Sequence, residues 1–163
     1  MRRAIATLLL GLLPILSHAD AFDDALTAIG AGDYERGVAL LVPLAEDGHP
    51  NAQYQLGALY AEGRGVLHDD AVARSWFRSA AEQGFAPAQF KLAAMYYEGR
   101  GVAQDYVHAA MWNAVAIANA SPEYVAAYEQ FHDALQALMS TEQSAEAMSM
   151  ARRCIDAEFK ACD

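Results

Sequence analysis

The sequence predicts an all-α fold, an α-solenoid of stacked antiparallel helix hairpins. The main observation is an internal repeat: residues 48–83 and 84–119 align without a gap at a period of 36 residues, and 15 of these positions are identical. Self-similarity at such a period is typical of helical arrays, in which each unit buries its apolar face against its neighbours. In addition, no segment shows the alternation of apolar and polar residues that a half-buried strand requires.

Two helices are expected before the full repeats. The first, residues 21–31, ends at Gly32, which can adopt the left-handed conformation that commonly terminates a helix. The second, residues 34–46, follows Asp33, whose carboxylate can accept hydrogen bonds from the backbone of the first turn as an N-cap. Residues 33–48 thus correspond to the second half of a repeat.

Each full repeat predicts a first helix with one narrow apolar stripe, because Ala, Leu and Tyr recur at positions i, i+4 and i+8. These residues are Ala52, Leu56 and Tyr60 in one copy and Ala88, Leu92 and Tyr96 in the other. Gly63 and Gly99 then stand where a helix C-terminus requires a left-handed residue. A tight glycine turn is therefore expected between the two helices of each repeat.

The second helix of each repeat is expected to begin after an aspartate, Asp69 or Asp105, which serves as the N-cap and suits the positive end of the helix dipole. Its apolar stripe carries a tryptophan, Trp76 or Trp112, with alanines about one turn before and after it. These tryptophans are predicted to be the largest packing residues of the array.

Residues 123–163 are predicted to form two capping helices. Ser121 and Pro122 give a start signal for the first of them, and Ser140 and Gln143 form a capping box before the second. The expected apolar stripes comprise Tyr124, Ala127, Tyr128, Phe131, Leu135 and Leu138, and then Ala147, Met148, Ala151, Cys154 and Ile155. This pair is expected to cover the open apolar end of the stack, as repeat arrays require.

The N-terminus, residues 1–19, has the pattern of an export signal. Two arginines precede an apolar run at 4–16, and a small-x-small site predicts cleavage between Ala19 and Asp20. The run is short for a membrane span, and no cysteine follows the site, so a lipid anchor is not expected. A buried N-terminal helix is the alternative. The sequence therefore predicts a periplasmic or secreted protein that does not insert in the membrane after signal removal.

The charge of the chain argues against two classes of partner. The formal net charge is −10, and removal of residues 1–19 would leave 9 basic and 21 acidic residues, a net charge of −12. Nucleic acids and anionic membranes are bound by clusters of Lys and Arg. Neither is expected as a partner, since the chain has only two lysines, Lys91 and Lys160.

The two cysteines, Cys154 and Cys162, predict a disulfide, because an even pair in an oxidising compartment is usually bridged. A continuous helix would separate their Cα atoms by ~12 Å, which exceeds the ~7 Å limit for a bridge. The helix must then stop between them and the chain must fold back. The alternative is a redox or metal pair, although the chain lacks C-x-x-C spacing there and a nearby histidine.

The pattern A-x-x-x-L-[GA]-x-x-Y-x-x-G-x-G-V, followed by Asp, Ala and Trp, resembles the Sel-1-like repeat, a relative of the tetratricopeptide repeat. Residues 51–86 and 87–122 match it in full, and the N-terminal helices at 20–50 contain a partial copy. The end of the chain, 123–163, is similar to the tail of short exported bacterial members. The resemblance implies an α-solenoid that works as an adaptor or scaffold in protein complexes, with no shared active site.

Catalytic and metal-binding motifs find little support in the sequence. The motifs G-x-S-x-G, H-E-x-x-H and S-x-x-K are absent. The histidines after the signal are not paired at helical spacing, as a metal site would favour: His49, His68, His108 and His132. The cluster His68-Asp69-Asp70 could suggest a cation site, but the capping role explains its first aspartate. No catalytic, metal or cofactor residue is therefore expected.

Five residues are candidates for partner binding. Gln55 and Lys91 occupy a position of the first helix that varies between the copies, where specificity can reside, and Tyr97 adds an aromatic side chain to one copy only. Packing against the next helix is the alternative for Tyr97. Arg64 and Arg100 recur inside the glycine turns. They either brace the turn by contacts with neighbouring glutamates or recognise a carboxylate of the partner.

The sequence thus predicts an exported, non-catalytic adaptor or scaffold of the bacterial envelope that presents a groove to an unidentified protein or peptide and requires no cofactor. Two alternatives remain. One is a small envelope hydrolase or β-lactam-binding protein, suggested by cysteine-rich relatives whose regular cysteine pair in each repeat is absent here. The other is a structural subunit that associates weakly with copies of itself.

Overall fold

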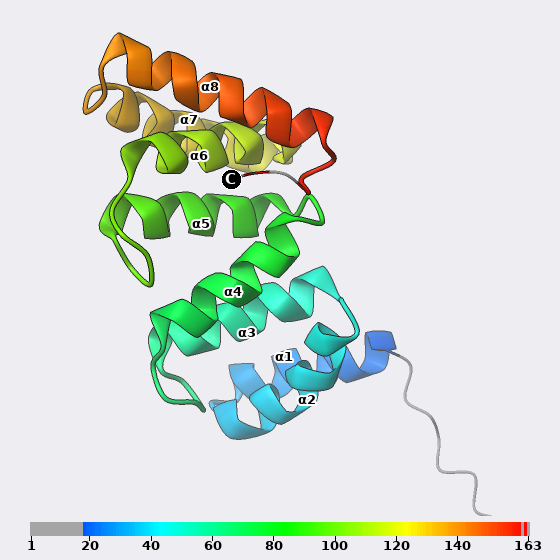
Figure 1. The fold of residues 1–163 in the computed structure, drawn as a ribbon. Coiled ribbons are helices and arrows are strands. Elements are labelled where there is room, and N and C mark those ends of the chain that lie inside the picture. Colours follow the sequence, from blue (N-terminus) through cyan, green and yellow to red (C-terminus); the bar gives the residue numbers. More distant parts are fainter. Residues whose placement is uncertain (1–17, 161, 163) are drawn as a thin grey trace, which may run out of the picture.

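The computed structural model describes residues 18–160 and 162, and this part of the chain forms eight helices and no strand. The helices form antiparallel hairpins stacked into an array (Figure 1), so the prediction of an all-α solenoid is confirmed. The helices are α1 (His18–Gly30), α2 (Tyr34–Glu46), α3 (Pro50–Glu62), α4 (Asp70–Ala81), α5 (Ala86–Glu98), α6 (Tyr106–Asn119), α7 (Pro122–Gln136) and α8 (Thr141–Asp156).

Most of the predicted export signal, residues 1–17, lies outside the described residues. Helix α1 begins at His18, so the predicted cleavage site between Ala19 and Asp20 falls in its first turn. None of the described helices is both long enough and apolar enough to cross a membrane.

The predicted helix caps are present. Asp33, Asp69 and Asp105 each accept backbone hydrogen bonds from the first turn of the helix that follows. Gly63 and Gly99 end α3 and α5 in the left-handed conformation, with φ of 65° and 72°. Local residue types therefore set the ends of the helices in both full repeats.

The ends of the capping helices follow the prediction in part. Ser140 and Gln143 form the expected capping box at the start of α8. Ser121 is the N-cap of α7 and Pro122 is its first residue, as predicted, although the Ser121 side chain makes no cap hydrogen bond.

The two tryptophans are not equivalent, which corrects the prediction for the second helices. Trp112 of α6 is fully buried, whereas Trp76 of α4 is half-buried and Phe77 beside it is 1% exposed. Phe77 fits there because it faces Gly57, where an added Cβ would lie 2.9 Å from the ring. In the next repeat Ala93 replaces this glycine and Asn113 replaces Phe77. The second repeat therefore places its largest side chain one position earlier.

The cover over α6 explains the burial of Trp112. Helices α7 and α8 both pack against α6. Trp112 belongs to one buried cluster with Ala147, Ala151 and Cys154 of α8. Helices α7 and α8, which pack against α6 more than against each other, therefore cover the apolar end of the array, as repeat proteins require.

Four side chains expected in the core of the last hairpin are exposed instead. The exposed fractions are 48% for Tyr124, 49% for Leu138, 41% for Met148 and 37% for Ile155. Because α7 and α8 follow the last repeat, their outer faces contact no further helix among the described residues. The predicted stripes were thus too wide, and only the sides that face α6 are buried.

The chain ends in a disulfide between Cys154 and Cys162, whose Cα atoms are 4.5 Å apart. Helix α8 stops at Asp156 between them, as the distance argument requires. The chain reverses through Glu158 and Phe159, which both have positive φ. The ring of Phe159 lies against Gly84, so the tail contacts the turn before α5.

Candidate protein-binding groove

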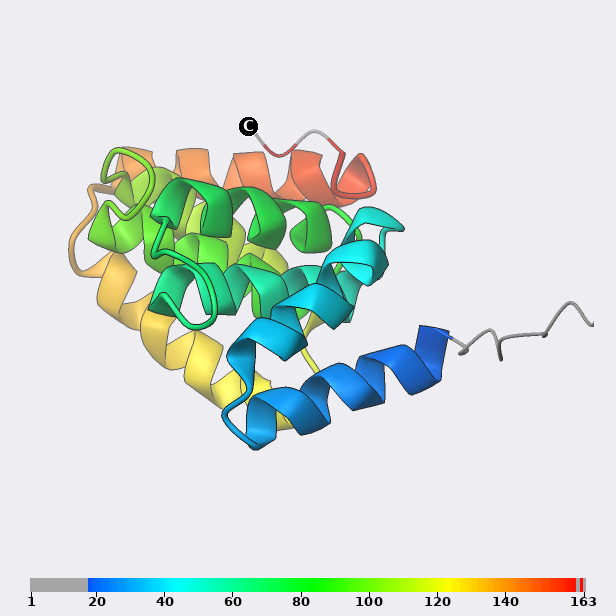
Figure 2. The ribbon, with the colours of Figure 1, turned by 90° about the horizontal axis from the view of Figure 1, so that it is seen from below.

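A groove of about 630 Å³ lies on the side of the array formed by the first helix of each hairpin. Its floor consists of α3 and α5, and its rims are α1 and α7, which the curvature of the array brings to the same side (Figure 2). Half of its lining residues are aromatic: Phe22, Tyr54, Phe85, Phe90, Tyr124 and Tyr128. We call this hollow the inner groove.

The repeat register builds the floor of the inner groove. Tyr54 and Phe90 are one period apart, and so are Gln55 and Lys91. Because α3 and α5 are equivalent helices of adjacent repeats, each pair forms a row across the floor. An aromatic row therefore lies beside a polar row.

Aromatic contacts hold the walls of the groove in place. Phe90 stacks on Tyr128 of α7 with ring centroids 4.3 Å apart, and Tyr128 in turn stacks on Tyr124 at 6.1 Å. Tyr54 meets Phe85 edge to face at 5.5 Å. Burial raises the pKa of Tyr54 and of Tyr128, so both phenols are protonated at neutral pH. The groove thus offers apolar surface together with hydroxyl groups.

The structure places two of the five candidate residues, Gln55 and Lys91, in the inner groove. Lys91 is exposed and is the one charged residue among the described side chains that line it. Gln55 and Lys91, together with Asn51, form no side-chain hydrogen bond or ion pair within the described part of the chain. These three polar side chains are thus available to a ligand.

Tyr97 lies outside the inner groove and packs against the last helices. Its ring contacts Tyr106 of α6 and Phe131 of α7, with centroid distances of 5.8 Å and 5.5 Å. Its carbonyl accepts a hydrogen bond from Gln104. These contacts favour the packing interpretation over direct partner binding.

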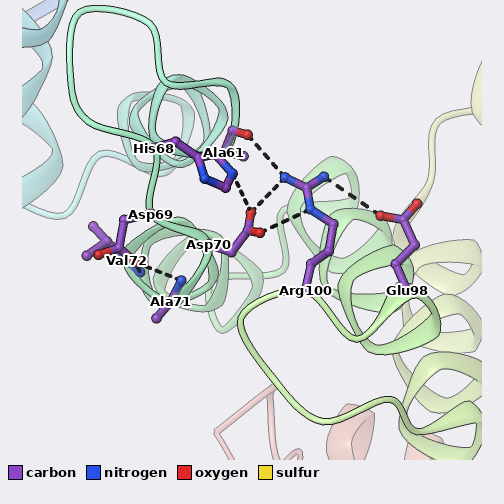
Figure 3. Close-up of polar contacts among 8 residues, drawn as sticks. All are labelled: Ala61, His68, Asp69, Asp70, Ala71, Val72, Glu98 and Arg100. Atoms are coloured by element: carbon purple, nitrogen blue, oxygen red, sulfur yellow. Dashed lines mark hydrogen bonds and ion pairs between the residues drawn. The ribbon is translucent and has the colours of Figure 1, made fainter.

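Arg100 braces the junction between the two full repeats (Figure 3). Its Nη2 donates to Asp70 Oδ1 at 2.6 Å and to the carbonyl of Ala61 at 3.1 Å. The hydrogen bond between Arg100 and Asp70 is the main reason why the pKa of Asp70 is lowered and the pKa of Arg100 is raised. The glutamate expected to contact Arg100 in the glycine turn, Glu98, is more distant, with 3.7 Å between the charged groups.

Arg64 has the same place one repeat earlier. It pairs with Glu62 at 3.0 Å, and its guanidinium lies 5.4 Å from the ring centre of Tyr34, the residue one period before Asp70. Both turn arginines therefore contact the second helix of the preceding unit. These contacts favour the bracing interpretation for both residues.

The histidines near the helix ends have structural contacts. His49 accepts a hydrogen bond from the backbone of Ala52 and stacks on Phe22 at 5.1 Å. His108 lies 2.7 Å from Asp105 and stacks on Tyr96. Within residues 18–160 and 162, no three His, Cys, Asp or Glu side chains are arranged to hold a metal ion.

At the suggested cation site, both aspartates are engaged. Asp69 caps α4 through the backbone of Ala71 and Val72, and Asp70 binds Arg100, with His68 3.3 Å away (Figure 3). Asp69 is therefore explained by its role as the N-cap of α4, and Asp70 by its ion pair with Arg100 at the junction between the repeats.

The rims of the inner groove, which carry Phe22, Leu26 and Tyr124, are not predictable from the repeat pattern. Helices α1 and α7 lie outside the two full repeats, so the repeat register could not place their side chains. The apolar pattern predicts Tyr124 in the core, whereas the structure exposes it on the rim of the groove.

The stacked hairpins and their inner groove define an α-solenoid repeat protein. The Sel1 repeat family model matches residues 50–85 and 86–112. A Sel1 repeat protein from Oxalobacter formigenes is 30% identical, with a TM-score of 0.62, over 72% of this chain and 88% of that chain. The chain belongs to the Sel1 repeat family, whose repeats generally mediate protein–protein interactions.

A second solved structure is similar over a larger part of this chain. It is a protective antigen with an SLR fold that is present in uropathogenic Escherichia coli strains. The similarity has a TM-score of 0.79 and 25% identity over 88% of this chain. This chain spans 32% of the length of that protein. A comparison with curated proteins gave no match.

Proposed function

We propose that the protein is an exported, non-catalytic adaptor that binds another protein or a peptide in the inner groove. The observation that carries the proposal is the groove itself, with six aromatic side chains and three polar ones that have no described partner. Aromatic side chains dominate the energetic centres of protein interfaces because they bury large areas at low entropic cost. A partner segment that covers these aromatic rings would be held by the burial of their apolar surface.

The lining of the groove supports binding without catalysis. Among the described residues that form it, none is a serine, cysteine, histidine, aspartate or glutamate. Hydrolysis by a nucleophile and a base, or by a pair of carboxylates, draws on these side chains. Lysine and tyrosine can also act in such reactions, but Lys91 has no described contact with a base, so the lining favours binding over hydrolysis.

Export is supported by the predicted signal at residues 1–19 and by the disulfide between Cys154 and Cys162. Disulfides persist mainly in oxidising compartments such as the periplasm or the extracellular medium. We therefore place the adaptor in the envelope or outside the cell.

Self-association is a second candidate function, because the last hairpin exposes three apolar side chains. Met148 and Ile155 are seven residues apart on α8 and thus share a face, and Leu138 precedes that helix. Sedimentation velocity of the mature protein, from Asp20 onward, tests this candidate. A concentration-dependent dimer that Met148→Glu abolishes would support it, whereas a monomer at high concentration would reject it.

The proposed groove can be tested by filling it. Ala127 is exposed on α7 and lines the inner groove, whereas its neighbour Ala126 is exposed on the same helix outside it. Ala127→Trp should abolish capture of a partner from native envelope extract, and Ala126→Trp should retain it. Thermal unfolding would verify that both variants are folded. A partner retained equally by both variants would show that binding occurs elsewhere.

A further inference from the structure

We propose that the inner groove recognises an acidic side chain in an otherwise apolar segment of its protein partner. Lys91 and Gln55 bind the carboxylate, and the adjacent aromatic row binds a neighbouring apolar side chain. This inference rests on the proposed function, because it names the chemistry of the segment that occupies the same groove.

Lys91 is a positive charge in the groove of an acidic protein. The chain carries 21 acidic residues and a formal net charge of −10, yet Lys91 is the one charged group among the described residues of the groove lining. Lys91 is therefore a positive spot in the groove of an acidic protein, and the two glutamates of the adjoining hollow, Glu62 and Glu98, are paired with arginines. Opposite charge in this spot favours an acidic ligand and disfavours a basic one.

Lys91 is available to a ligand. The other basic residues considered for binding are occupied, since Arg100 is paired with Asp70 and Arg64 with Glu62. The ammonium of Lys91, by contrast, has no hydrogen bond or ion pair to any described residue. Its donors can thus be satisfied by a ligand without breaking a contact of the fold.

The polar row of the groove contains one cation and one amide. Gln55 and Lys91 occupy equivalent positions of α3 and α5 and line the same groove, so an amide N–H donor and an ammonium border one site. One cation and one amide match the single charge of a carboxylate. A phosphate carries up to two negative charges and is usually bound by clusters of arginine. The row therefore favours a carboxylate.

The surroundings strengthen this contact. Tyr54 and Phe90 precede Gln55 and Lys91 in the sequence, so an aromatic row borders the polar one. A segment that covers the aromatic rings would exclude water from the carboxylate. Hydrogen bonds between charged groups gain strength in such a medium of low dielectric constant.

The hollow continues on both sides of Lys91, which decides where the carboxylate lies in the segment. A second hollow of about 140 Å³ shares Lys91 with the inner groove. Apolar side chains line part of it, and so do Glu62, Glu98 and Arg100, of which Glu98 pairs with Arg100 and Glu62 with Arg64. A chain can thus pass Lys91 and continue in either direction. We therefore assign the carboxylate to an internal aspartate or glutamate and not to the C-terminus of the partner.

A display library tests the inference without a known partner. The probe is a set of random 12-residue segments followed by a constant tail, so that none carries a free C-terminal carboxylate. Selection on the mature protein should enrich Asp or Glu next to an aromatic or aliphatic residue. Binding of an enriched peptide should weaken by about tenfold in Lys91→Ala, the loss expected for one hydrogen bond to a charged group. Lys160→Ala, which removes the other lysine, should leave it unchanged.

Charge reversal gives the sharper outcome. Lys91→Glu should lose the acidic peptides and bind versions in which the acid is replaced by lysine. Enriched peptides without an acid, or peptides unaffected by Lys91→Glu, would overturn the inference. If Ala127→Trp abolishes the binding of these peptides and Ala126→Trp does not, the inner groove is still their binding site, although Lys91 does not recognise an acid. Enrichment that is insensitive to Ala127→Trp, or no enrichment, would reject both proposals.

Discussion

Arg100 and Asp70 join the glycine turn of one repeat to the second helix of the repeat before it. The guanidinium makes two hydrogen bonds to the carboxylate, of 2.6 Å from Nη2 and 3.3 Å from Nε, and a third to the carbonyl of Ala61. Paired hydrogen bonds of this kind fix orientation as well as distance. At the preceding junction Tyr34 takes the place of Asp70, so an aromatic contact replaces the ion pair.

A double-mutant cycle should measure the contribution of this pair. We expect a coupling energy of about 0.5–1 kcal/mol between Arg100→Ala and Asp70→Ala, because the side chains are 41% and 21% exposed and water screens the pair. Chemical denaturation of the wild type, both single variants and the double variant provides it. Arg153→Ala, on the exposed face of α8, is a control for the loss of one arginine. Additive effects would show that the pair does not hold the junction.

The same pair should make stability depend on acid pH. The hydrogen bond from Arg100 lowers the pKa of Asp70 in the folded protein below its ordinary value of 3.8. A lowered folded pKa stabilises the protein above the unfolded pKa, and this stabilisation is lost as the pH falls through the folded pKa. The unfolding free energy should therefore decrease below about pH 4. Denaturation curves between pH 7 and pH 2.5 should show a smaller decrease for Asp70→Asn. An equal decrease in both proteins would contradict the role of Asp70.

Two glycines with positive φ should differ in their tolerance of alanine. At Gly101 (φ +64°) an added Cβ would overlap the carbonyl of Asp70, whereas at Gly32 (φ +83°) it would meet nothing within 4 Å. Gly32→Ala should cost about 1 kcal/mol for the left-handed conformation alone. Gly101→Ala should cost clearly more, because the turn must also move away from α4. Equal unfolding free energies would show that the close approach is not required.

The two tryptophans provide a test of the end cover. Trp112 is fully buried beneath the last hairpin, so Trp112→Ala should cost about 3–5 kcal/mol of unfolding free energy. Trp76 is half-buried, and Trp76→Ala should cost about 1–2 kcal/mol, in proportion to the smaller apolar area removed from water. Urea denaturation of the two variants gives both values. Similar losses of unfolding free energy in the two variants would contradict the finding that Trp112 is more deeply buried than Trp76.

The disulfide should be formed in protein purified from an oxidising compartment. Thiol titration of the denatured, unreduced protein should find no free thiol, since Cys154 and Cys162 are the two cysteines of the chain. The Cys154→Ser, Cys162→Ser variant should lose roughly 2–3 kcal/mol, the loop-entropy estimate for a short loop. Two reactive thiols in the native product would reject the bridge.

Features that depend on a few neighbouring residues were predictable from the sequence. Asp69 and Asp105 cap their helices, and Gly63 and Gly99 terminate theirs, because a cap or a left-handed residue acts within one helical turn. The repeat register also placed Gln55 and Lys91 at equivalent positions, which the structure shows in one groove.

Features that depend on the neighbours of a whole helix were not predictable in this way. Helices that come later in the chain explain why Trp112 is more deeply buried than Trp76. They also provide the contacts of Tyr97, which packs on α6 and α7. The helix pattern predicts Tyr124 in the core because it marks an apolar face without showing which part of that face another helix covers. A hydrophobic pattern shows which face of a helix is apolar, but it does not show which other helix packs against that face.

The sequence alone thus determined the repeat, the ends of the helices in the full repeats and the solenoid class, since these follow from residue types at fixed short spacings. The tertiary structure alone decided that α1 and α7 face each other across α3 and α5 to form the inner groove. Each hairpin is rotated slightly against the one before it, and such rotations add up along an array into a curved surface. Residues about one hundred positions apart, such as Phe22 and Tyr124, therefore line the same site.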